Sequence, residues 1–507
     1  MNYLIGVDIG TSGTKTILFD ENLNIIASAQ KEYPMYQPQN GWAEQLPEDW
    51  KKASLETLKE VIKTSKINSE EIKGIGLSGQ MHGLVMLDEL GNVIRPSIIW
   101  CDQRTGNEVF EITEKIGRER LIEITANPAL TGWTAAKILW IRNNEPNNYS
   151  SCKHILLPKD YIRYVLTGEF ATEYSDASGT QLLDVPNRCW SDELLDSLNI
   201  DKSFMPKIYE SYEVTGNILP NIAEITGLST STVVVGGASD NAAAAIGSGI
   251  VEDGNVFTTI GTSGVVYAHS NKIRIDPKGR VHTCCSAVPG AWHVMGVTQS
   301  AGLSLKWFKD NFCQDYIEEA DKKGIKPYDI MNRDVEEVPI GSNKLIYLPY
   351  LMGERTPHLN PDCRGVFFGL SAIHTKKDLI RAIMEGVSFS LKDCSDILNE
   401  MGIYINEMKV CGGGAASGPW RQILSDVYDL DVKTIMQTEG PALGAAILAG
   451  VGVSIFDSVE SACKKFITVD KINHPIFEHT EKYNELHDIY KNLYFNLQDQ
   501  YKSLAAL

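Results

Sequence analysis

Two copies of the pentapeptide Ile-Gly-Thr-Ser-Gly, at Ile9–Gly13 and Ile260–Gly264, stand about half a chain apart in this 507-residue protein. An apolar run leads into and out of each copy, so each is predicted to form a strand, a glycine-rich turn and a second strand. Such a turn can direct several backbone N–H groups at one point, which suits a phosphate. Two ordinary hairpins with the same turn chemistry are the alternative interpretation. Two identical copies at this spacing favour two similar domains that hold one polyphosphate between them.

Charged side chains flank the first pentapeptide only. Asp8 ends the strand before the turn, where a carboxylate can hold Mg2+ directly or through water. Lys15 follows the turn as a point charge for phosphate, and Thr11 and Ser12 add hydroxyl groups. Asp8 could equally cap the turn, and the motif alone does not separate the two roles. Uncharged residues take the equivalent places in the second copy, so we expect that turn to be a neutral cradle for phosphates.

A second carboxylate follows the apolar run Val233–Val235. Asp240 and Asn241 begin an alanine-rich segment that is predicted to be helical. An aspartate at a helix start is commonly an N-cap. The small residues Gly236–Ala238 nevertheless favour a ligand that approaches the backbone closely.

Three further segments contain glycines in patterns that can bind a ligand. Gly353–His358 either lines a cleft or caps a turn. The glycines of Cys411–Ala416 form either a shelf for a flat ring or a tight strand-to-helix turn. Gly74–Gly79 fits the dinucleotide pattern G-x-G-x-x-G, but the strand-like Leu84–Leu87 follows in place of a helix, so we reject a Rossmann site. A Walker A loop is excluded because the dipeptide Gly-Lys does not occur.

The order of predicted elements repeats along the chain. In the first half, strands at Tyr3–Asp8, Thr14–Asp20 and Asn24–Lys31 precede a helix from Pro47 to about Lys66. In the second half, strands at Asn255–Ile260, Gly264–Ala268 and Trp292–Val297 precede a helix from about Ser300 to Asn311. We therefore expect an α/β protein with two copies of one architecture, residues 1–246 and 247–507, and a ligand cleft between them.

Length and composition narrow the classes of function. A chain of 507 residues is too long for one core, and 43% hydrophobic with 22% charged residues is ordinary for a globular protein. The net charge of −18 disfavours a nucleic-acid partner. None of the ten cysteines has Cys-x-x-Cys spacing, which indicates a reducing compartment. Without a basic leader or a run long enough to span a bilayer, we expect a cytoplasmic protein without a membrane partner. The oligomeric state is not determined, and a homodimer stays open.

Residues 3–450 resemble the FGGY carbohydrate kinases of the actin–Hsp70–sugar kinase superfamily, with the xylulokinase branch most similar. Two patterns carry the resemblance: Gly132–Asn144, which includes Trp133, Thr134 and Lys137, and Gly365–Glu385. The resemblance implies two ribonuclease-H-like domains that close on ATP and a sugar. Xylulokinases commonly have Gly-Gly before the catalytic aspartate, whereas Ala238 and Ser239 stand here. Both are small, so we expect the chemistry to be kept, and the difference bears on which pentulose is bound.

The same resemblance implies a role for each motif. Asp240 would be the general base, and Asp8 would position Mg2+. The implied sugar contacts are Met81, His82, Asp240, Asn241 and Trp133, with Trp100, Asp102 and Arg104 nearby. The implied ATP contacts are Thr11, Ser12, Lys15, Gly261, Thr262, Gly413, Gly414 and Ser417.

We therefore expect ATP-dependent phosphorylation of a ketopentose, D-xylulose at its terminal 5-hydroxyl, with Asp240 as base and Mg–ATP held between the domains. The alternative within the class is a kinase for ribulose, another ketose, gluconate or a polyol. Met81-His82 argues against the glycerol branch, because the proteins of that branch resemble one another in having Arg-Glu at that place. An actin-like or Hsp70-like ATPase without a sugar substrate is the alternative from another class. The paired elements Gln80–Gly83 and Asp240-Asn241 argue against it.

Overall fold

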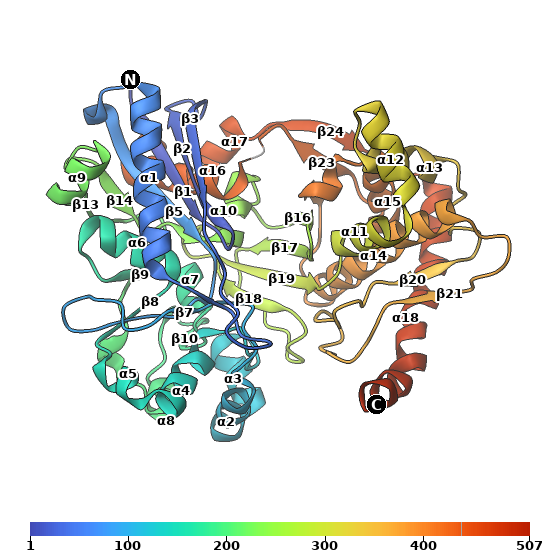
Figure 1. The fold of residues 1–507 in the computed structure, drawn as a ribbon, viewed down its shortest axis with the longest axis horizontal. Helices are drawn as coiled ribbons and strands as arrows, with labels where there is room; N and C mark the ends of the chain where they lie inside the picture. Colours follow the sequence, from blue (N-terminus) through green and yellow to red (C-terminus); the bar gives the residue numbers. More distant parts are fainter. Residues whose placement is uncertain (438) are drawn as a thin grey trace.

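The computed structural model describes residues 1–437 and 439–507 and contains two lobes, each built on a seven-stranded sheet (Figure 1). The first sheet has the order β13-β14-β5-β1-β2-β3, with β15 beside β5. Its strands are β1 (Tyr3–Ile9), β2 (Gly13–Asp20), β3 (Ile25–Glu32), β5 (Ile72–Gly79), β13 (Val214–Asn217), β14 (Val233–Val235) and β15 (Ala238–Ser239). The second sheet has the order β18-β19-β17-β16-β22-β23-β24. Its strands are β16 (Asn255–Ile260), β17 (Gly264–Ser270), β18 (His282–Cys285), β19 (Trp292–Thr298), β22 (Glu407–Cys411), β23 (Val432–Ile435) and β24 (Val469–Asn473).

The two sheets share one pairing scheme. In the first sheet, β1 pairs antiparallel with β2 and parallel with β5, and β5 pairs parallel with β14. In the second, β16 pairs antiparallel with β17 and parallel with β22, and β22 pairs parallel with β23. The predicted repeat of one α/β architecture is therefore confirmed. The edge strand β18 was not predicted from the sequence.

Helices cover both faces of the sheets. The larger ones are α1 (Pro47–Ser65), α2 (Gly106–Ile116), α4 (Thr134–Asn144), α6 (Pro158–Thr167), α10 (Asp240–Gly247), α11 (Gly302–Phe312), α12 (Gln314–Lys323), α13 (Pro327–Glu336), α14 (Lys376–Glu400), α15 (Gly418–Tyr428), α16 (Gly440–Gly452) and α18 (Phe477–Ala505). The shorter ones are α3 (Arg118–Thr125), α5 (Pro146–Ser151), α7 (Tyr174–Ser178), α8 (Asp192–Leu198), α9 (Pro220–Thr226) and α17 (Val459–Phe466), with 3-10 turns η1 (Ser69–Glu71), η2 (Lys202–Phe204) and η3 (Gly413–Ala416). Small two-stranded sheets contain β4 (Glu44–Gln45), β6 (Val85–Leu87), β7 (Ser97–Ile98), β8 (His154–Leu156), β9 (Ala171–Glu173), β10 (Leu183–Asp184), β11 (Cys189–Trp190), β12 (Lys207–Tyr209), β20 (Ile346–Leu348) and β21 (Val366–Phe368).

The local predictions hold where the sequence pattern is strong. Helix α1 begins at Pro47, as predicted, and buries Trp50, Leu58 and Val61. Strand β5 is followed by β6 and not by a helix, which agrees with the rejection of a Rossmann site. None of the helices among the residues described combines the length and apolar character needed to cross a membrane.

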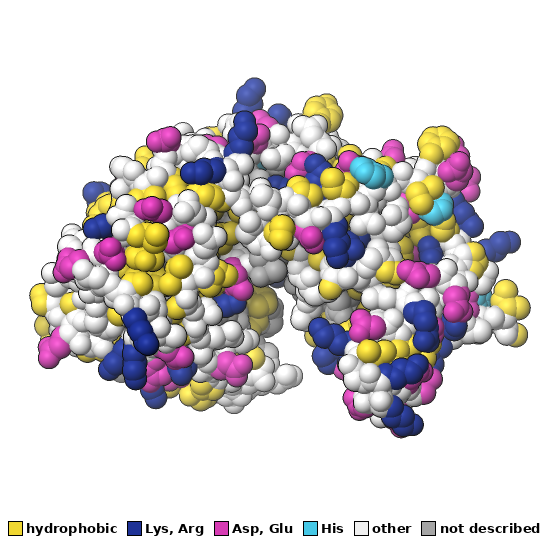
Figure 2. Space-filling view, turned by 90° about the horizontal axis from the view of Figure 1, so that it is seen from above, with side chains coloured by type: hydrophobic (Ala, Val, Ile, Leu, Met, Phe, Trp, Pro, Cys, Tyr) yellow, Lys and Arg dark blue, Asp and Glu magenta, His cyan; other side chains and the backbone are white. Residues whose placement is uncertain are grey.

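Helix α16 comes from the second half of the chain but packs on the sheet of the first half, where it contacts β1 and β5 and crosses α10 (Figure 1). The backbones approach very closely at this contact. A Cβ added at Gly6 would lie 1.9 Å from the Ala442 carbonyl oxygen, and one at Gly76 would lie 1.8 Å from that of Ala445. Only glycine leaves room for such an approach. The two lobes are therefore joined by interlocked small residues, and on their open side a deep notch separates them (Figure 2).

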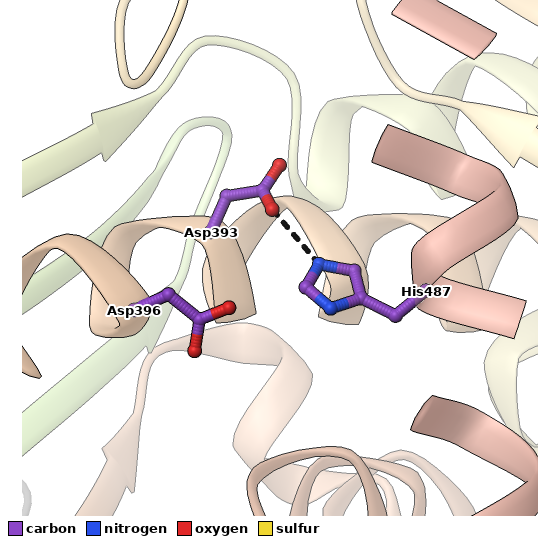
Figure 3. A group of neighbouring side chains, drawn as sticks. All are labelled: Asp393, Asp396 and His487. Atoms are coloured by element: carbon purple, nitrogen blue, oxygen red, sulfur yellow. Dashed lines mark hydrogen bonds and ion pairs between the residues drawn. The ribbon is translucent and has the colours of Figure 1, made fainter. Parts of the chain in front are cut away.

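Helix α18 is tied to α14 by a buried contact on the outside of the second lobe. His487 Nε2 lies 2.8 Å from Asp393 Oδ1, and Asp396 stands beside them on α14 (Figure 3). Burial raises the pKa of Asp393, and the His487 contact opposes that shift. Asp396 is 34% exposed and pairs with Lys392 at 3.1 Å. Asp393, Asp396 and His487 therefore form a hydrogen bond between two helices and an adjacent ion pair within α14.

The contact with α16 leads to a prediction about stability. Gly6→Ala places a methyl group against the Ala442 carbonyl, so we expect a loss of about 1–3 kcal/mol in the free energy of unfolding from overpacking. Urea denaturation measures it. Gly106→Ala, at the start of α2 where an added Cβ meets no atom within 4 Å, is the control and should unfold like the wild type. Equal midpoints for Gly6→Ala and the wild type would contradict the close approach.

Candidate active site

Three neighbouring parallel strands of the first sheet end at one edge, and each delivers polar groups there. In the register of the sheet, Asp8 on β1 and Ala238 on β15 both lie opposite Ser78 on β5. Just beyond these positions, β5 continues into Gln80–Gly83, and β15 continues into Asp240 at the start of α10. Because the carboxyl ends of parallel strands meet at the same edge, residues distant in sequence converge there.

Asp240 has the properties of a proton acceptor. Its Oδ1 accepts hydrogen bonds from the backbone N–H of Asn241 at 2.7 Å and from the Asn241 side chain at 3.1 Å. Its Oδ2 has no partner among the residues described. Burial first, and then the charge of Asp8, raise the pKa of Asp240 to about 7, while the Asn241 bonds oppose that shift. A carboxylate with one free oxygen and a pKa near neutrality can act as a general base. The side-chain nitrogen of Asn241 also lies 3.7 Å from Met81 Sδ. This contact joins Asp240-Asn241 to Gln80–Gly83, the two segments that are predicted to bind the sugar.

Asp8 lies beside Asp240, and its surroundings suit a cation. Ser78 Oγ donates to Asp8 Oδ1 at 2.9 Å, whereas Oδ2 has no partner among the residues described. Burial raises the pKa of Asp8, and the Ser78 bond and the Lys15 charge oppose the shift. Mg2+ prefers such hard oxygen ligands, so the residues present fit that ion. Lys15, opposite Asp8 on β2, pairs with Glu439, which immediately precedes α16.

His82 presents a neutral ring with one accepting nitrogen. Its Nδ1 lies 2.8 Å from the carbonyl oxygen of Gly179, and since a carbonyl can only accept, Nδ1 carries the proton. Burial, with smaller contributions from neighbouring cations, lowers the pKa of His82 to about 3. Nε2 is therefore a hydrogen-bond acceptor. The ring stacks on Trp133 with centroids 4.5 Å apart, and the His82 carbonyl accepts from Lys137 Nζ at 2.8 Å.

The second half of the chain contributes to the same region. The ring of His282, on β18, also packs against Trp133, with the ring centroids 5.6 Å apart. His282 Nδ1 lies 3.2 Å from Asn127 Oδ1, and its buried Nε2 has no partner in the described part of the chain. Burial holds the pKa of His282 well below its usual value. The predicted sugar site is thus bordered by both lobes.

Arg355 brings an unpaired cation to this border. Thr356 anchors its loop beside β18 and β19, because its hydroxyl donates to the Arg280 carbonyl at 2.8 Å and its N–H donates to the Val297 carbonyl at 2.9 Å. The Arg355 guanidinium makes no hydrogen bond or ion pair with the residues described, and its charge lowers the pKa of both His82 and His282. The sequence marked this polar loop but did not decide between a cleft wall and a turn cap.

Asp102 and Arg104 form an internal pair. Both side chains are almost completely buried, with Arg104 Nη2 2.7 Å from Asp102 Oδ2. Asp102 also accepts from the backbone N–H of Ala43 at 2.6 Å, and the Arg104 guanidinium stacks over Trp42 at 3.7 Å. Both side chains thus have protein partners, and their contact with a sugar stays a prediction.

The first glycine-rich turn is connected to the sugar motif by hydrogen bonds. Trp100 Nε1 donates to Thr11 Oγ1 at 3.0 Å. Gln80 Nε2 donates to Gln45 Oε1 at 2.7 Å, and Gln45 Nε2 donates to the Thr11 carbonyl at 2.7 Å. The neighbouring Ser12 is exposed. A displacement of the turn would therefore move Gln45 and, through it, Gln80, which precedes Met81 and His82.

A cavity of about 530 Å³ opens in the second lobe beside the second glycine-rich turn. Five predicted ATP contacts line it: Gly261, Thr262, Gly413, Gly414 and Ser417. The first turn, with Thr11, Ser12 and Lys15, does not contribute to its lining. Leu303, Leu305, Met384 and Trp420 give the cavity apolar walls, which suit a flat ring.

Helix α13 forms a wall of this cavity that the sequence did not reveal. Tyr328, Asp329 and Asn332 line the space, and Ser417 Oγ donates to Asn332 Oδ1 at 2.6 Å. The segment reads as an ordinary amphipathic helix, so no local signal marks it. The three glycines of 412–414 do mark their segment in the sequence. In the structure an added Cβ would meet no atom within 4 Å at Gly413, whereas at Gly412 and Gly414 it would lie 2.8 Å and 2.5 Å from atoms of Ile260.

Comparisons with known proteins agree with this geometry. The model of the FGGY family of carbohydrate kinases, N-terminal domain, matches residues 3–247, and that of the C-terminal domain matches residues 256–453. The chain is 40% identical to xylulose kinase of Bacillus subtilis (strain 168), over 100% of this chain and 99% of that protein. It is 33% identical to gluconokinase of the same strain, over 99% and 98%. The structure of ligand-bound xylulose kinase from Lactobacillus acidophilus matches with a TM-score of 0.92 at 28% identity, covering 99% of this chain and 100% of that one.

The raised pKa of Asp240 leads to a prediction about stability. Folded Asp240 keeps its proton up to about pH 7, whereas the unfolded chain releases it near pH 4, so wild-type stability falls as the pH rises through that window. Asp240→Asn should not show this pH-dependent loss of stability, because the asparagine side chain does not titrate. Its stability relative to the wild type should increase by about 2–3 kcal/mol between pH 5 and pH 8 in urea denaturation. A difference that does not change with pH would contradict the raised pKa.

Proposed function

Because the chain belongs to the FGGY family of carbohydrate kinases, we propose that it transfers the γ-phosphoryl group of ATP to the 5-hydroxyl of D-xylulose, giving D-xylulose 5-phosphate and ADP. The observation that carries the proposal is the convergence of Asp240, which has a free oxygen and a pKa of about 7, with Asp8 and the neutral His82. Full-length similarity to proteins named xylulose kinase supports the choice of sugar.

In this proposal Asp240 accepts the proton of the attacking hydroxyl. The sugar oxygen forms a bond to the γ-phosphorus, the bond from that phosphorus to the β-phosphate oxygen breaks, and ADP leaves with the electron pair. The hydroxyl proton passes to Asp240, whose Oδ2 is not engaged by the protein. General base catalysis of this kind contributes about 10²–10⁴-fold to the rate. The Asn241 bonds to Oδ1 keep the carboxylate oriented during the transfer.

The phosphate-binding part of the proposal uses both glycine-rich turns. Asp8 would hold Mg2+, which neutralises charge on the transferred group when bound. The backbone N–H groups of the turns and the hydroxyls of Thr11 and Ser12 would bind phosphate oxygens. Lys15 would leave Glu439 and bind phosphate instead. The Lys15 side chain is about a third exposed, and ion pairs that are open to solvent contribute only about 0–1 kcal/mol to stability, so this exchange costs little. The adenosine would occupy the cavity lined by Gly413, Gly414 and Ser417 (with Gly261 and Thr262).

The sugar would lie between the two lobes. His82 Nε2 would accept from a sugar hydroxyl, and Arg355 would donate to a sugar oxygen from the opposite side. Met81 and Trp133 would pack against its carbon atoms. Asp102 and Arg104 would keep the segment that begins at Trp100 in place. Closure of the lobes would exclude water, which limits hydrolysis of ATP.

A second candidate substrate is an aldonate such as D-gluconate. An unpaired, largely buried guanidinium favours a ligand carboxylate, because charge-assisted hydrogen bonds are stronger than those to a neutral hydroxyl. A protein named gluconokinase is 33% identical to the chain over nearly its full length.

A substrate panel tests the proposal. D-xylulose, D-ribulose, D-gluconate and glycerol are each mixed with ATP, Mg2+ and the protein, and ADP release is followed by a coupled assay. We expect the highest kcat/KM with D-xylulose and none of that turnover with Asp240→Ala, which should still bind ATP. A higher kcat/KM with D-gluconate would select the second candidate, and ADP release without sugar would indicate an ATPase.

The role of Arg355 can be separated from that of the nucleotide site. Arg355→Ala and His82→Ala should each raise the sugar KM by about 10–100-fold, the effect of losing one hydrogen bond to a charged or buried group, and should change the ATP KM less than about twofold. Arg364→Ala is the control, since among the described residues Arg364 donates only to the nearby carbonyls of Pro361 and Cys363. Equal changes in the sugar KM and the ATP KM of Arg355→Ala would contradict a position of Arg355 in the sugar site.

A further inference from the structure

A completely buried group of charges lies behind the reactive edge. This ion cluster consists of Lys159, Asp160 and Arg163 on α6, Glu173 at the end of β9, and Asp176 on α7. Lys159 Nζ lies 2.7 Å from Asp160, 3.2 Å from Glu173 and 2.9 Å from Asp176. Arg163 Nη1 lies 2.8 Å from Asp160. Removing so many charges from water is costly, and buried ion pairs often give no net stability, so a role in geometry is the better explanation of the cluster.

One connection of the ion cluster leads to Asp240. Ser175 Oγ donates to Glu173 Oε1 at 2.8 Å and accepts from the backbone N–H of Ser239 at 3.0 Å. Ser239 directly precedes Asp240. Arg163 Nη2 also donates to the carbonyl oxygen of Gly236. The segment that carries the proposed base is therefore held at both of its ends by the cluster and its partner serine.

The other connection leads to His82. Glu173 accepts from the backbone N–H groups of Ser175 at 2.7 Å and Asp176 at 2.9 Å, so it caps the start of α7. Gly179 follows the end of that short helix, and its carbonyl accepts from His82 Nδ1. A Cβ at Gly179 would lie only 2.8 Å from the same nitrogen. The position of α7 therefore determines the position of the imidazole.

From these two connections we infer that the ion cluster positions Asp240 and His82 relative to each other, and that Ser175 is the positioning residue for Asp240. The inference rests on the proposed function for the role of Asp240 as base. Within residues 236–238 only Ala238 carries a side chain, a buried methyl group. Backbone hydrogen bonds from Gly236 and Gly237 to Glu213 and Ser211 hold the start of the segment, and the bond from Ser239 to Ser175 Oγ holds the end next to Asp240. A misplacement of a reacting group by about 1 Å can lower the rate by about 100-fold.

Two neighbouring serines provide a matched test. Ser175 and Ser211 are both buried and both donate a hydroxyl hydrogen bond to Glu173, at 2.8 Å and 3.0 Å. Only Ser175 also accepts from Ser239. Ser175→Ala should lower kcat by about 10–100-fold with less than a twofold change in the ATP KM, whereas Ser211→Ala should keep kcat within about twofold. Both should lower Tm to a similar extent. A similar loss of kcat in both variants, or none in Ser175→Ala, would overturn the inference.

The test does not depend on the identity of the sugar, because kcat is measured with the substrate that gives the highest turnover in the panel. If the wild type phosphorylates no sugar, the proposed function fails, and the positioning is then read from the backbone N–H of Asn241, which donates to Asp240 Oδ1. Its NMR chemical shift and hydrogen exchange are followed in the full-length protein. Ser175→Ala should shift the resonance and speed the exchange, and Ser211→Ala should change neither. Equal behaviour of the two variants would reject the positioning role.

Discussion

The contact of α16 with the first sheet is the constraint on which the rest of the structure depends. Gly6 and Gly76 let the helix backbone come within van der Waals distance of β1 and β5, and no side chain separates the two. Helix α16 belongs to the second half of the chain, so the contact joins the lobes through backbone atoms. It also brings Glu439, next to the start of the helix, to Lys15 beside the first glycine-rich turn. A larger residue at either glycine would lift the helix and change the spacing between the two phosphate turns.

Burial sets the protonation of the reactive edge. The pKa of Asp240 is raised to about 7, that of His82 is lowered to about 3, and that of the buried Lys137 is lowered to about 7. Desolvation is the largest cause in each case, because it disfavours the charged form of acids and bases alike. The hydrogen bonds of Asn241 and Gly179 then orient groups whose charge has been reduced. The same edge of the sheet thus carries a proton acceptor, Asp240, and a neutral hydrogen-bond acceptor, His82.

The two halves share a strand order but differ in chemistry. The first half carries the carboxylates and the sugar motif at the ends of β1, β5 and β15, whereas the second half encloses the cavity beside its glycine-rich turn. The second half also sends His282 and Arg355 to the border with Trp133. Residues from one half therefore complete a surface begun by the other, which a single copy of the architecture could not provide.

The sequence by itself determined the strands around the twin turns, the turns themselves, and the places of Asp8 and Asp240 at the ends of apolar runs, because periodicity and turn chemistry are local properties of the chain. It left the glycines of Cys411–Ala416 open between a shelf and a tight turn. Only the tertiary structure decided that Lys15 pairs with Glu439, that Asp102 and Arg104 form a buried ion pair that Glu44 extends, and that α13 lines the cavity. It also decided the environment of Arg355 and the two connections of the ion cluster. These facts depend on contacts between segments that are far apart in sequence, and such contacts are set by the packing of whole elements.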